Sequence, residues 1–429
     1  MLFIYRTLFF FLFPFLLIFT YIRLFLNKEH KIRFKEKIYS SNFRVNKNKN
    51  KKLVWFHCSS IGEFLSVYPL ISKINNSNKD LEFLITSTTL SSANLIEKKF
   101  IQHDNIMHRF FPLDIEYLSE NFLNAWKPNM ACFVDSEIWP NFLFKIKEKK
   151  IPLMLLNGRI TKKTFNRWKV FFNFARKTFN NFDLCLASSK ESEDNLKKLQ
   201  VRNLKYLGNL KFSFNNNIEN IDLYNKKILD NFKVWCAAST HEGEELIAIK
   251  THMKIREKYS NILTIIIPRH VNRSFDLKKL SNKFKLRSQI LNEKDKIHSD
   301  TEILIINSFG VVSKYFNYCK NAFIGKSFVE GLKLGGGQNP IEAAKAGCKI
   351  FHGPYVYNFK EIYDLLQSYG ISEKLNDGSE LAKKLIENLE KPKEINKQTV
   401  YLLDNYGENV LNQTIEELNK FMKLKYLNA

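Results

Sequence analysis

The sequence lacks the patterns that would indicate a metal centre or a disulfide framework. Its six cysteines are scattered, none forms a C-x-x-C pair, and most lie in apolar, strand-like runs. This pattern predicts buried free thiols in a reducing compartment. The nine histidines include no H-E-x-x-H sequence and no cluster with cysteine at zinc spacing. We therefore expect neither a structural metal nor a metal cofactor.

Acidic residues are scarce relative to basic ones. The chain has 43 Asp and Glu against 67 Lys and Arg, a formal net charge of +24. Such a charge attracts phospholipid headgroups or nucleic acid, but biased composition, as in the run NKNKNKK, explains part of the excess equally well. A hydrophobic content of 45% is typical of a globular protein rather than a disordered chain, and the length of 429 residues predicts two domains.

The N-terminal segment predicts the compartment. Residues 7–22 carry no charge, and with their apolar flanks they approach the roughly 20 residues that span a bilayer. Because no small-residue cleavage site follows, we expect an uncleaved anchor. The Lys- and Arg-rich stretch 28–52 predicts that the rest of the chain is cytoplasmic. The alternative is an interfacial helix, because Pro14 and the flanking Arg6 and Arg23 weaken a simple span.

Apolar runs alternate with amphipathic stretches along the remaining chain, which predicts an α/β fold with parallel sheets. The expected strands of a first sheet are 53–58, 82–86, 130–134, 152–156 and 184–187, and those of a second are 234–238, 263–268, 302–306, 321–325 and 348–353. The Asn-rich segment 213–227 is the best candidate linker. The expected organisation is an anchor (1–27), an N-terminal domain (28–212), a linker (213–232) and a C-terminal domain (233–429) whose last helix is a candidate to pack back on the N-terminal domain.

Glu63 follows the first expected strand. The sequence WFHCSSIGEF (55–64) runs from a strand through Ser59, Ser60 and Gly62 into a helix start. In doubly wound folds ligands bind beyond the carboxyl ends of the strands, so Glu63 can act there as a general base for an attacking hydroxyl. Ser60 and Glu63 also have the spacing of a capping box, in which the glutamate only satisfies a backbone N–H. The residues alone leave both interpretations open.

Two further candidate segments of the same half lie at strand ends, the second of them just before the expected linker. FVDSEIWPN contains Asp135 and Glu137, which can bind sugar hydroxyls or stabilise positive charge at an anomeric carbon. The alternative is that Asp135 or Ser136 only caps a helix. Lys211, in LGNLKF, can pair with a phosphate or a carboxylate, or remain a solvated charge.

A glycine-rich loop marks the second half. Seven of the 15 glycines fall within 325–353, where GGGQNPIEAAKAG ends in a helix start. Asn339 suits the N-cap, Pro340 the first helical position and Glu342 the first turn. Such a helix start can bind a phosphate while Glu342 accepts hydrogen bonds from ribose hydroxyls, although a purely structural capped helix is the alternative. Arg269, at another strand end, is a natural phosphate or pyrimidine contact.

These segments, in this order, resemble the Kdo transferases, which move 3-deoxy-D-manno-octulosonic acid (Kdo) from CMP-Kdo to a lipid A precursor in the Gram-negative inner membrane. The resemblance covers nearly the whole chain. It implies a GT-B fold with two facing Rossmann-like domains. The segments that carry it are HCSSIGE, SEIWPN, NGR, GNLKF, AASTHEGEE, PRH, GGGQNPIEAAKAG and FHGPYVYNF.

The resemblance implies roles for individual positions. Glu63 matches the catalytic base, which deprotonates the acceptor's primary hydroxyl, and Glu137 and Lys211 match the transition-state stabilisers. The family inverts the anomeric centre by a single displacement. The positions that match its CMP-binding segments are Pro268, Arg269, Phe309, Gly310, Val311, Asn339, Pro340, Ile341 and Glu342.

Two segments depart from the family's usual pattern. Gly310-Val311-Val312 stands where Gly-Glu-Leu is usual, which removes one carboxylate contact with the nucleotide. Gln338 stands where the family usually has the histidine of Gly-Gly-His-Asn-Pro. Both departures concern donor contacts and the choice among related keto-sugar acids.

We therefore expect an inverting transferase that uses CMP-Kdo and no metal, and that acts on a lipid A precursor (lipid IVA) at the cytoplasmic face of the inner membrane. Its expected partners include inner-membrane phospholipid but no nucleic acid. One alternative is another membrane-associated GT-B enzyme with a uridine-nucleotide sugar. The other is a non-catalytic binder of anionic lipid or nucleic acid on this scaffold. The number of Kdo residues transferred stays open, because it depends on how the acceptor sits.

Overall fold

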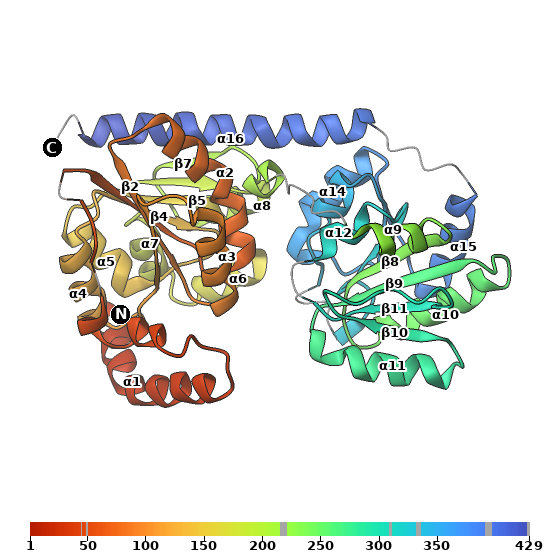
Figure 1. The fold of residues 1–429 in the computed structure, drawn as a ribbon. Helices are drawn as coiled ribbons and strands as arrows, with labels where there is room; N and C mark the ends of the chain where they lie inside the picture. The colour runs from red at the N-terminus through yellow and green to blue at the C-terminus, as the bar shows by residue number, and fades with distance from the viewer. Residues whose placement is uncertain are drawn as a thin grey trace. The chain divides into compact units, whose positions relative to one another are not determined.

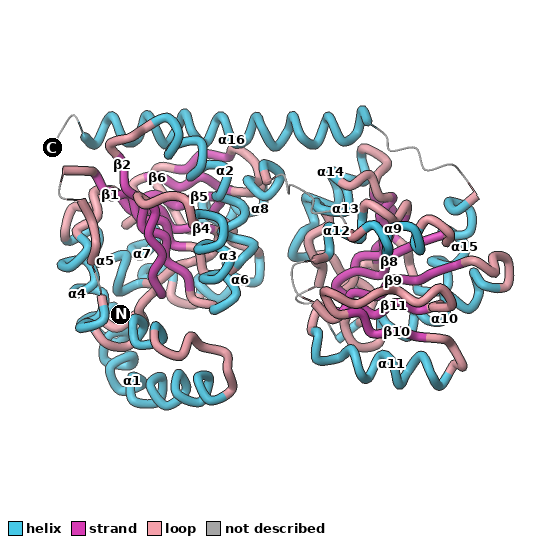
Figure 2. The backbone as a smooth tube through the Cα atoms, in the orientation of Figure 1, coloured by secondary structure: helices cyan, strands magenta, loops and turns pink. Residues whose placement is uncertain are grey.

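The chain divides into two compact units, each with its own parallel sheet (Figures 1 and 2). The computed structural model describes residues 1–43, 45–48, 50–214, 221–308, 311–331, 336–390 and 397–426. Unit 1 comprises Met1–Phe214 and Tyr406–Ala429, and unit 2 comprises Asn215–Asn405. Each sheet has seven strands, and the strands pair in parallel.

The strands of unit 1 follow the order β3-β2-β1-β4-β5-β6-β7. They are β1 Lys52–His57, β2 Leu81–Ser87, β3 Ile106–Phe110, β4 Met130–Val134, β5 Leu153–Gly158, β6 Leu184–Ala187 and β7 Leu204–Tyr206. The helices are α1 Leu2–Phe25, α2 Ile61–Ser77, α3 Leu90–Phe100, α4 Glu116–Trp126, α5 Pro140–Glu148, α6 Lys162–Lys169, α7 Phe172–Phe179, α8 Lys190–Lys198 and, from Tyr406 onward, α16 Lys397–Tyr426. Short 3-10 turns lie at Arg33–Lys37, Ser40–Asn42 and Leu210–Ser213.

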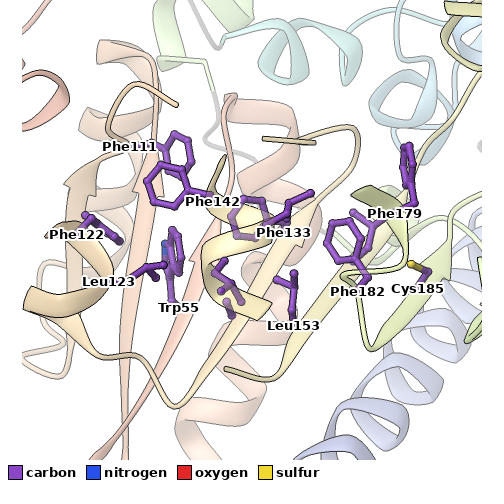
Figure 3. Packing of buried hydrophobic residues seen from close by; sticks show 14 of the residues in the cluster. Trp55, Phe111, Phe122, Leu123, Phe133, Phe142, Leu153, Phe179, Phe182 and Cys185 are labelled. Atoms are coloured by element: carbon purple, nitrogen blue, oxygen red, sulfur yellow. The ribbon is translucent and has the colours of Figure 1, made fainter. Parts of the chain in front are cut away.

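Both faces of this sheet are covered, which explains why its inner strands are buried almost throughout and are apolar at most positions. Side chains of β1 alternate between two hydrophobic clusters, with Trp55 on one face and Phe56 on the other. The Trp55 cluster is rich in aromatic rings, among them Phe133 of β4, Phe122 of α4 and Phe142 of α5, as Figure 3 shows. The Phe56 cluster includes residues of α2 and of α16, among them Leu411 and Leu418. Full burial of a side chain of this size stabilises the fold by about 1.5–3 kcal/mol.

The strands of unit 2 follow the order β10-β11-β9-β8-β12-β13-β14. They are β8 Lys233–Thr240, β9 Ile262–Pro268, β10 Ser288–Leu291, β11 Ile303–Ile306, β12 Asn321–Ile324, β13 Lys349–His352 and β14 Ser372–Lys374. The helices are α9 Leu223–Leu229, α10 Glu244–Arg256, α11 Ser274–Lys283, α12 Val312–Phe316, α13 Ile341–Lys345, α14 Lys360–Ser368 and α15 Gly378–Leu389, with 3-10 turns at Val271–Arg273 and Tyr357–Phe359.

In each sheet the first strand of the unit lies at the point where the strand order reverses. In unit 1 that point lies between β1 and β4, and in unit 2 between β8 and β12. The loops that leave two such strands diverge to opposite sides of the sheet, so the carboxyl edge offers a binding crevice there. The segments after β1, β4, β8 and β12 are therefore where each unit should bind its ligand.

The expected fold class is confirmed: two Rossmann-like units and an N-terminal apolar helix. All six cysteines are buried thiols, as predicted. The segment predicted to be a linker, 213–232, contains α9, which Asp222 caps through Tyr224 N–H and Asn225 N–H. Residues 215–220 of that segment lie outside the described residues.

Candidate active site

In unit 1 the segments that follow β1 and β4 bring together several charged side chains. Glu63 lies in the first turn of α2, just after β1, and Asp135 and Glu137 follow β4. The neighbouring strands β1 and β4 pair from Val54↔Met130 to His57↔Phe133, so their ends lie next to each other. The two sequence segments that we singled out separately therefore form one cluster.

Glu63 has the hydrogen bonds of a capping residue. Ser60 is the N-cap of α2, and its hydroxyl accepts a hydrogen bond from Glu63 N–H at 3.4 Å. In return the Glu63 carboxylate accepts from Ser59 N–H at 2.6 Å and from the Ser60 hydroxyl at 3.0 Å. The predicted capping arrangement is thus present, with Ser59 rather than Ser60 supplying the N–H. These bonds hold the carboxyl group at the helix start in one orientation.

The surroundings of Glu63 also change its acidity. The pKa of its carboxyl rises to about 8, first because burial penalises the ionised form and then because Glu137 and Asp135 repel its charge. The hydrogen bonds from Ser60 and Ser59 oppose this rise but do not cancel it. A carboxyl group with a pKa near 8 can take up and release a proton near neutral pH.

Glu137 is held by two donors on one oxygen. Its Oε2 atom lies 2.8 Å from Trp139 Nε1, which donates, and 3.1 Å from His57 Nε2. Because an ionised carboxylate only accepts, His57 must carry its proton on Nε2. The hydroxyl of Thr86 lies 3.0 Å from Nδ1 and accepts a hydrogen bond from Trp55 Nε1 at 2.9 Å.

This chain of hydrogen bonds fixes the orientation of the Glu137 carboxylate. His57 is completely buried, and its ring stacks on Phe111 with centroids 3.7 Å apart. Nothing in the part of the chain that the structure describes donates to the second oxygen of Glu137, Oε1. A ligand can therefore meet Oε1 without displacing a protein hydrogen bond.

Asp135 and Lys211 form a buried ion pair. Lys211 Nζ donates to Asp135 Oδ2 at 2.9 Å, and the two side chains expose 15% and 6% of their surface. Asp135 has a left-handed backbone (φ 61°), which lets its main chain bond to both Leu156 and Arg159. Helix α5 begins at Pro140 with Trp139 as its N-cap, so the alternative that Asp135 or Ser136 caps this helix is wrong.

Gly62 leaves the start of α2 open on one side. A Cβ atom placed there would have no heavy atom within 4 Å, and the residue is exposed. Since space rather than a neighbour surrounds this glycine, a larger residue would fold without a clash but would cover the backbone next to Glu63. The backbone next to Glu63 is therefore open to solvent.

In unit 2 a buried carboxylate stabilises the loop after β12 by accepting hydrogen bonds from its backbone. Glu244, at the start of α10, is fully buried and accepts hydrogen bonds from four backbone N–H groups. Three of these donors are consecutive, Lys326 to Phe328, at 2.6, 2.7 and 3.1 Å, and the fourth is His241 at 3.0 Å. Glu244 therefore ties the segment after β8 to the segment after β12.

Positive side chains gather around this loop. Lys326 and Arg269 interact electrostatically, and the pKa of Lys326 falls because of burial and then because of Arg269. The rings of His241 and His270 lie 5.8 Å apart, and burial lowers the pKa of His241, with Lys326 adding to the effect. Cations held near one another at strand ends make this edge of the sheet suited to an anion.

The glycine-rich loop packs beside Lys326. Gly337 N–H donates to Lys326 O at 2.7 Å, and a Cβ at Gly336 would lie 2.2 Å from Tyr355 O. Asn339 Oδ1 accepts from Ile341 N–H at 3.1 Å. The predicted cap is displaced by one residue, because Pro340 occupies the N-cap position and α13 begins at Ile341.

Glu342 lies in the first turn of α13, as predicted. Burial raises the pKa of its carboxyl group, and no side chain among the described residues donates to it. Pro268 ends β9, and Val311 is buried at the N-cap of α12. Phe309 and Gly310 lie outside the described residues.

Sequence reasoning missed residues that act through other residues. His57 and Trp139 orient Glu137, while Glu244 organises the loop that carries Lys326. Of these residues only Lys326 could have been identified from the sequence, because it directly follows the expected strand 321–325 and so lies at a strand end. The contacts of His57 and Glu244 depend on strand neighbours that composition does not show, whereas Trp139 lies only two residues from Glu137.

The sequence comparisons with known proteins agree on one family. A family model for 3-deoxy-D-manno-octulosonic-acid transferase (kdotransferase) matches residues 32–214. The 3-deoxy-D-manno-octulosonic acid transferase of Rickettsia bellii is 30% identical over 95% of this chain and 94% of its own. A mitochondrial protein of Arabidopsis thaliana named "Probable 3-deoxy-D-manno-octulosonic acid transferase" is 32% identical over 73% and 72%. A UDP-GlcNAc 2-epimerase from Neisseria meningitidis, 16% identical over 85% and 100%, shares the fold with a TM-score of 0.56.

Proposed function

Because the chain belongs to the Kdo transferase family of glycosyltransferases, we propose that it transfers Kdo from CMP-Kdo to a lipid A precursor with inversion of the anomeric carbon. The proposed acceptor is the phosphorylated, acylated glucosamine disaccharide lipid IVA. The observation that carries the proposal is the Glu63 carboxyl group with a pKa of about 8, beside Glu137 and Asp135 at the strand reversal of unit 1.

Glu63 is the proposed general base. Its carboxylate takes the proton of the acceptor's primary hydroxyl while that oxygen forms a bond to the anomeric carbon of Kdo. The bond from the anomeric carbon to the phosphate oxygen breaks, and CMP leaves with the electron pair. One base and no covalent nucleophile suffice for a single displacement that inverts the centre.

Glu137 and Lys211 are the proposed stabilising groups. As the donor bond breaks, positive charge develops at the anomeric carbon, and the Oε1 atom of Glu137 can face it. Because Trp139 and His57 already hold Oε2, the carboxylate needs no reorganisation during the reaction. Lys211 adds a positive charge among three carboxyl groups and so limits their mutual repulsion.

Unit 2 is the proposed donor-binding unit. Arg269 and Lys326 would pair with the phosphate of CMP-Kdo, and the Glu342 carboxyl group would accept hydrogen bonds from the ribose. The segment Asn339–Pro340–Ile341 would line the nucleotide site, together with Pro268, the buried Val311, Phe309 and Gly310. Since these cations can neutralise the leaving phosphate, the proposed reaction needs no metal ion.

Membrane attachment through α1 is part of the proposal. This helix is long and apolar enough to cross a membrane, and the segment after it is rich in Lys and Arg. Such a sequence suits an anionic membrane surface, here the cytoplasmic face of the inner membrane, where the proposed lipid acceptor would be reached. Phospholipid of that membrane is thus a proposed partner.

The test is transfer by the purified protein in vesicles that contain lipid IVA. Mass analysis of the product should show one or more added Kdo residues, with CMP released in equal amount. Free CMP should inhibit and free UDP should not. Inhibition by UDP alone would favour a uridine-nucleotide donor, and polyanion binding without CMP release would favour a non-catalytic protein.

A further inference from the structure

Helix α1 has one face that packs on unit 1 (Figure 1). Phe9, Phe13 and Leu16 pack against the Trp55 cluster, and Thr20 is buried. With Tyr5 these residues are three or four positions apart, the spacing of a single stripe along a helix. The stripe runs nearly the full length of α1, so the helix lies along unit 1.

The start of α1 is held by polar contacts. The Tyr5 hydroxyl donates to Asp114 Oδ2 at 2.7 Å, and Asp114 is itself buried. Arg6 pairs with Glu116 at 2.8 Å and donates to Asn141 at 3.3 Å. Moving this end away from unit 1 would remove the Tyr5 partner of a buried carboxyl group.

The end of α1 is held as well. The ring of Tyr21 packs edge-on against Phe34 at 5.4 Å, and Arg23 pairs with Glu29 at 2.6 Å. The segment that carries these partners is joined to the sheet, because Lys37 donates to Thr88 O at 2.7 Å. Both ends of α1 therefore contact the same globular unit.

The opposite face of α1 is apolar and exposed. Large side chains on it include Phe3, Ile4, Leu8, Phe10, Phe11, Phe15, Ile18, Phe19, Ile22 and Phe25. Lysines 28, 31 and 35, just beyond the helix, are exposed, whereas the acids Glu29 and Glu36 are buried. The surface beside the apolar face thus exposes lysines, while the nearby acidic residues are buried. Such a surface complements a leaflet with anionic headgroups rather than a protein partner.

We infer that α1 lies in the plane of the membrane, with its exposed face in a single leaflet, and does not span the bilayer. Its 24 residues, about 36 Å of helix, are long enough to span, so length does not decide. The contacts decide, because a spanning helix would place its two ends on opposite sides of the membrane and only one end could touch unit 1. This arrangement rests on the proposed membrane attachment, but not on the donor or the acceptor.

Four positions spaced seven residues apart report the membrane depth along the exposed face of α1. They are Ile4, Phe11, Ile18 and Phe25, which are 60%, 68%, 58% and 85% exposed. Each is changed singly to cysteine and spin-labelled, while the six native cysteines, all buried, stay unlabelled. The full-length protein is bound to vesicles of phosphatidylethanolamine and phosphatidylglycerol. Label depth is measured from the accessibility to oxygen and to a water-soluble relaxation agent.

We expect all four labels at a similar depth, about 5–10 Å below the headgroups. Labels at Phe11 and Ile18 that lie about 10 Å or more deeper than those at Ile4 and Phe25 would show a spanning helix and overturn the inference. If a label is shielded from both reagents and its spectrum is broadened by the label of a second protein copy, this face binds another copy of the chain. That result would also overturn the inference. Failure of the protein to float with the vesicles would instead refute the attachment itself.

A matched pair of variants tests the docked face. Thr20→Cys should stay unreactive to maleimide in vesicles, whereas Phe19→Cys, on the exposed face, should react once detergent removes the lipid. Rapid labelling of Thr20→Cys in a folded protein would mean that α1 leaves unit 1.

In addition, a protease site placed before Met1 should be cut from the side of the membrane that exposes the globular units. Protection of that site would contradict an in-plane helix.

Discussion

The rate of Kdo transfer should follow the ionisation of Glu63. With a pKa of about 8, about a tenth of this carboxyl group is ionised at pH 7 and about a hundredth at pH 6. Because only the ionised form can accept the acceptor's proton, the rate should fall roughly tenfold per pH unit below 8 and level off above it. A glutamate with an ordinary pKa would give a flat profile over the same range.

The perturbation that tests this reasoning is Glu137→Gln. The negative charge of Glu137 is the largest charge effect that raises the Glu63 pKa, so its removal should move the midpoint of the profile to lower pH, by on the order of one unit. The maximal rate should fall too, but the midpoint is read from the normalised profile. Glu408→Gln, an equivalent change at an exposed position of unit 1, should leave the midpoint unchanged.

The assay is the initial rate of CMP release at saturating CMP-Kdo and lipid IVA, from pH 5.5 to 9.5. A thermal unfolding curve at each pH shows that the protein remains folded. Groups that face Glu63 are Glu137, Asp135 with its partner Lys211, and the hydroxyl of Ser60. A flat profile between pH 6 and 9, or the same midpoint in Glu137→Gln, would refute the account of this cluster.

Three further predictions concern residues that hold or bind. His57→Phe keeps the ring stacked on Phe111 but removes a hydrogen-bond donor to Glu137. The kcat should therefore fall about 100-fold with an unchanged KM for CMP-Kdo, and a change in KM alone would contradict a positioning role. Arg269→Ala should weaken CMP binding about tenfold or more in calorimetry, with the exposed Lys279→Ala as control; equal affinities would remove Arg269 from the donor site. Glu244→Ala leaves four backbone donors without their acceptor and should lower the free energy of unfolding, measured by urea denaturation, by about 3 kcal/mol or more. A much smaller loss would mean that the loop rearranges locally and does not depend on Glu244.

The strands that the sequence predicted are the inner ones. Expected strands such as 130–134 and 184–187 coincide with β4 and β6. The four strands that were not predicted, β3, β7, β10 and β14, are the two edges of each sheet. An edge strand pairs on one side only and packs less deeply, so sequences such as LKY and SEK carry no apolar run.

The candidate site was predictable one segment at a time. Strand ends pointed to Glu63, Glu137 and Lys211, because ligands bind at the carboxyl edge of such sheets. The pairing of Lys211 with Asp135, 76 residues apart, depends on the path of the chain after β7, which apolar patterning does not encode. The same holds for His57 and Glu137, whose contact joins two strands separated by two others in sequence.

The central claim is that the carboxyl group of Glu63 is the base of the transfer. Single-turnover transfer from CMP-Kdo to lipid IVA by Glu63→Gln, measured beside CMP binding, tests it most directly. The account predicts a rate at least about 100-fold below that of the unmodified protein, with the same affinity for CMP. Transfer at an unchanged rate would contradict it.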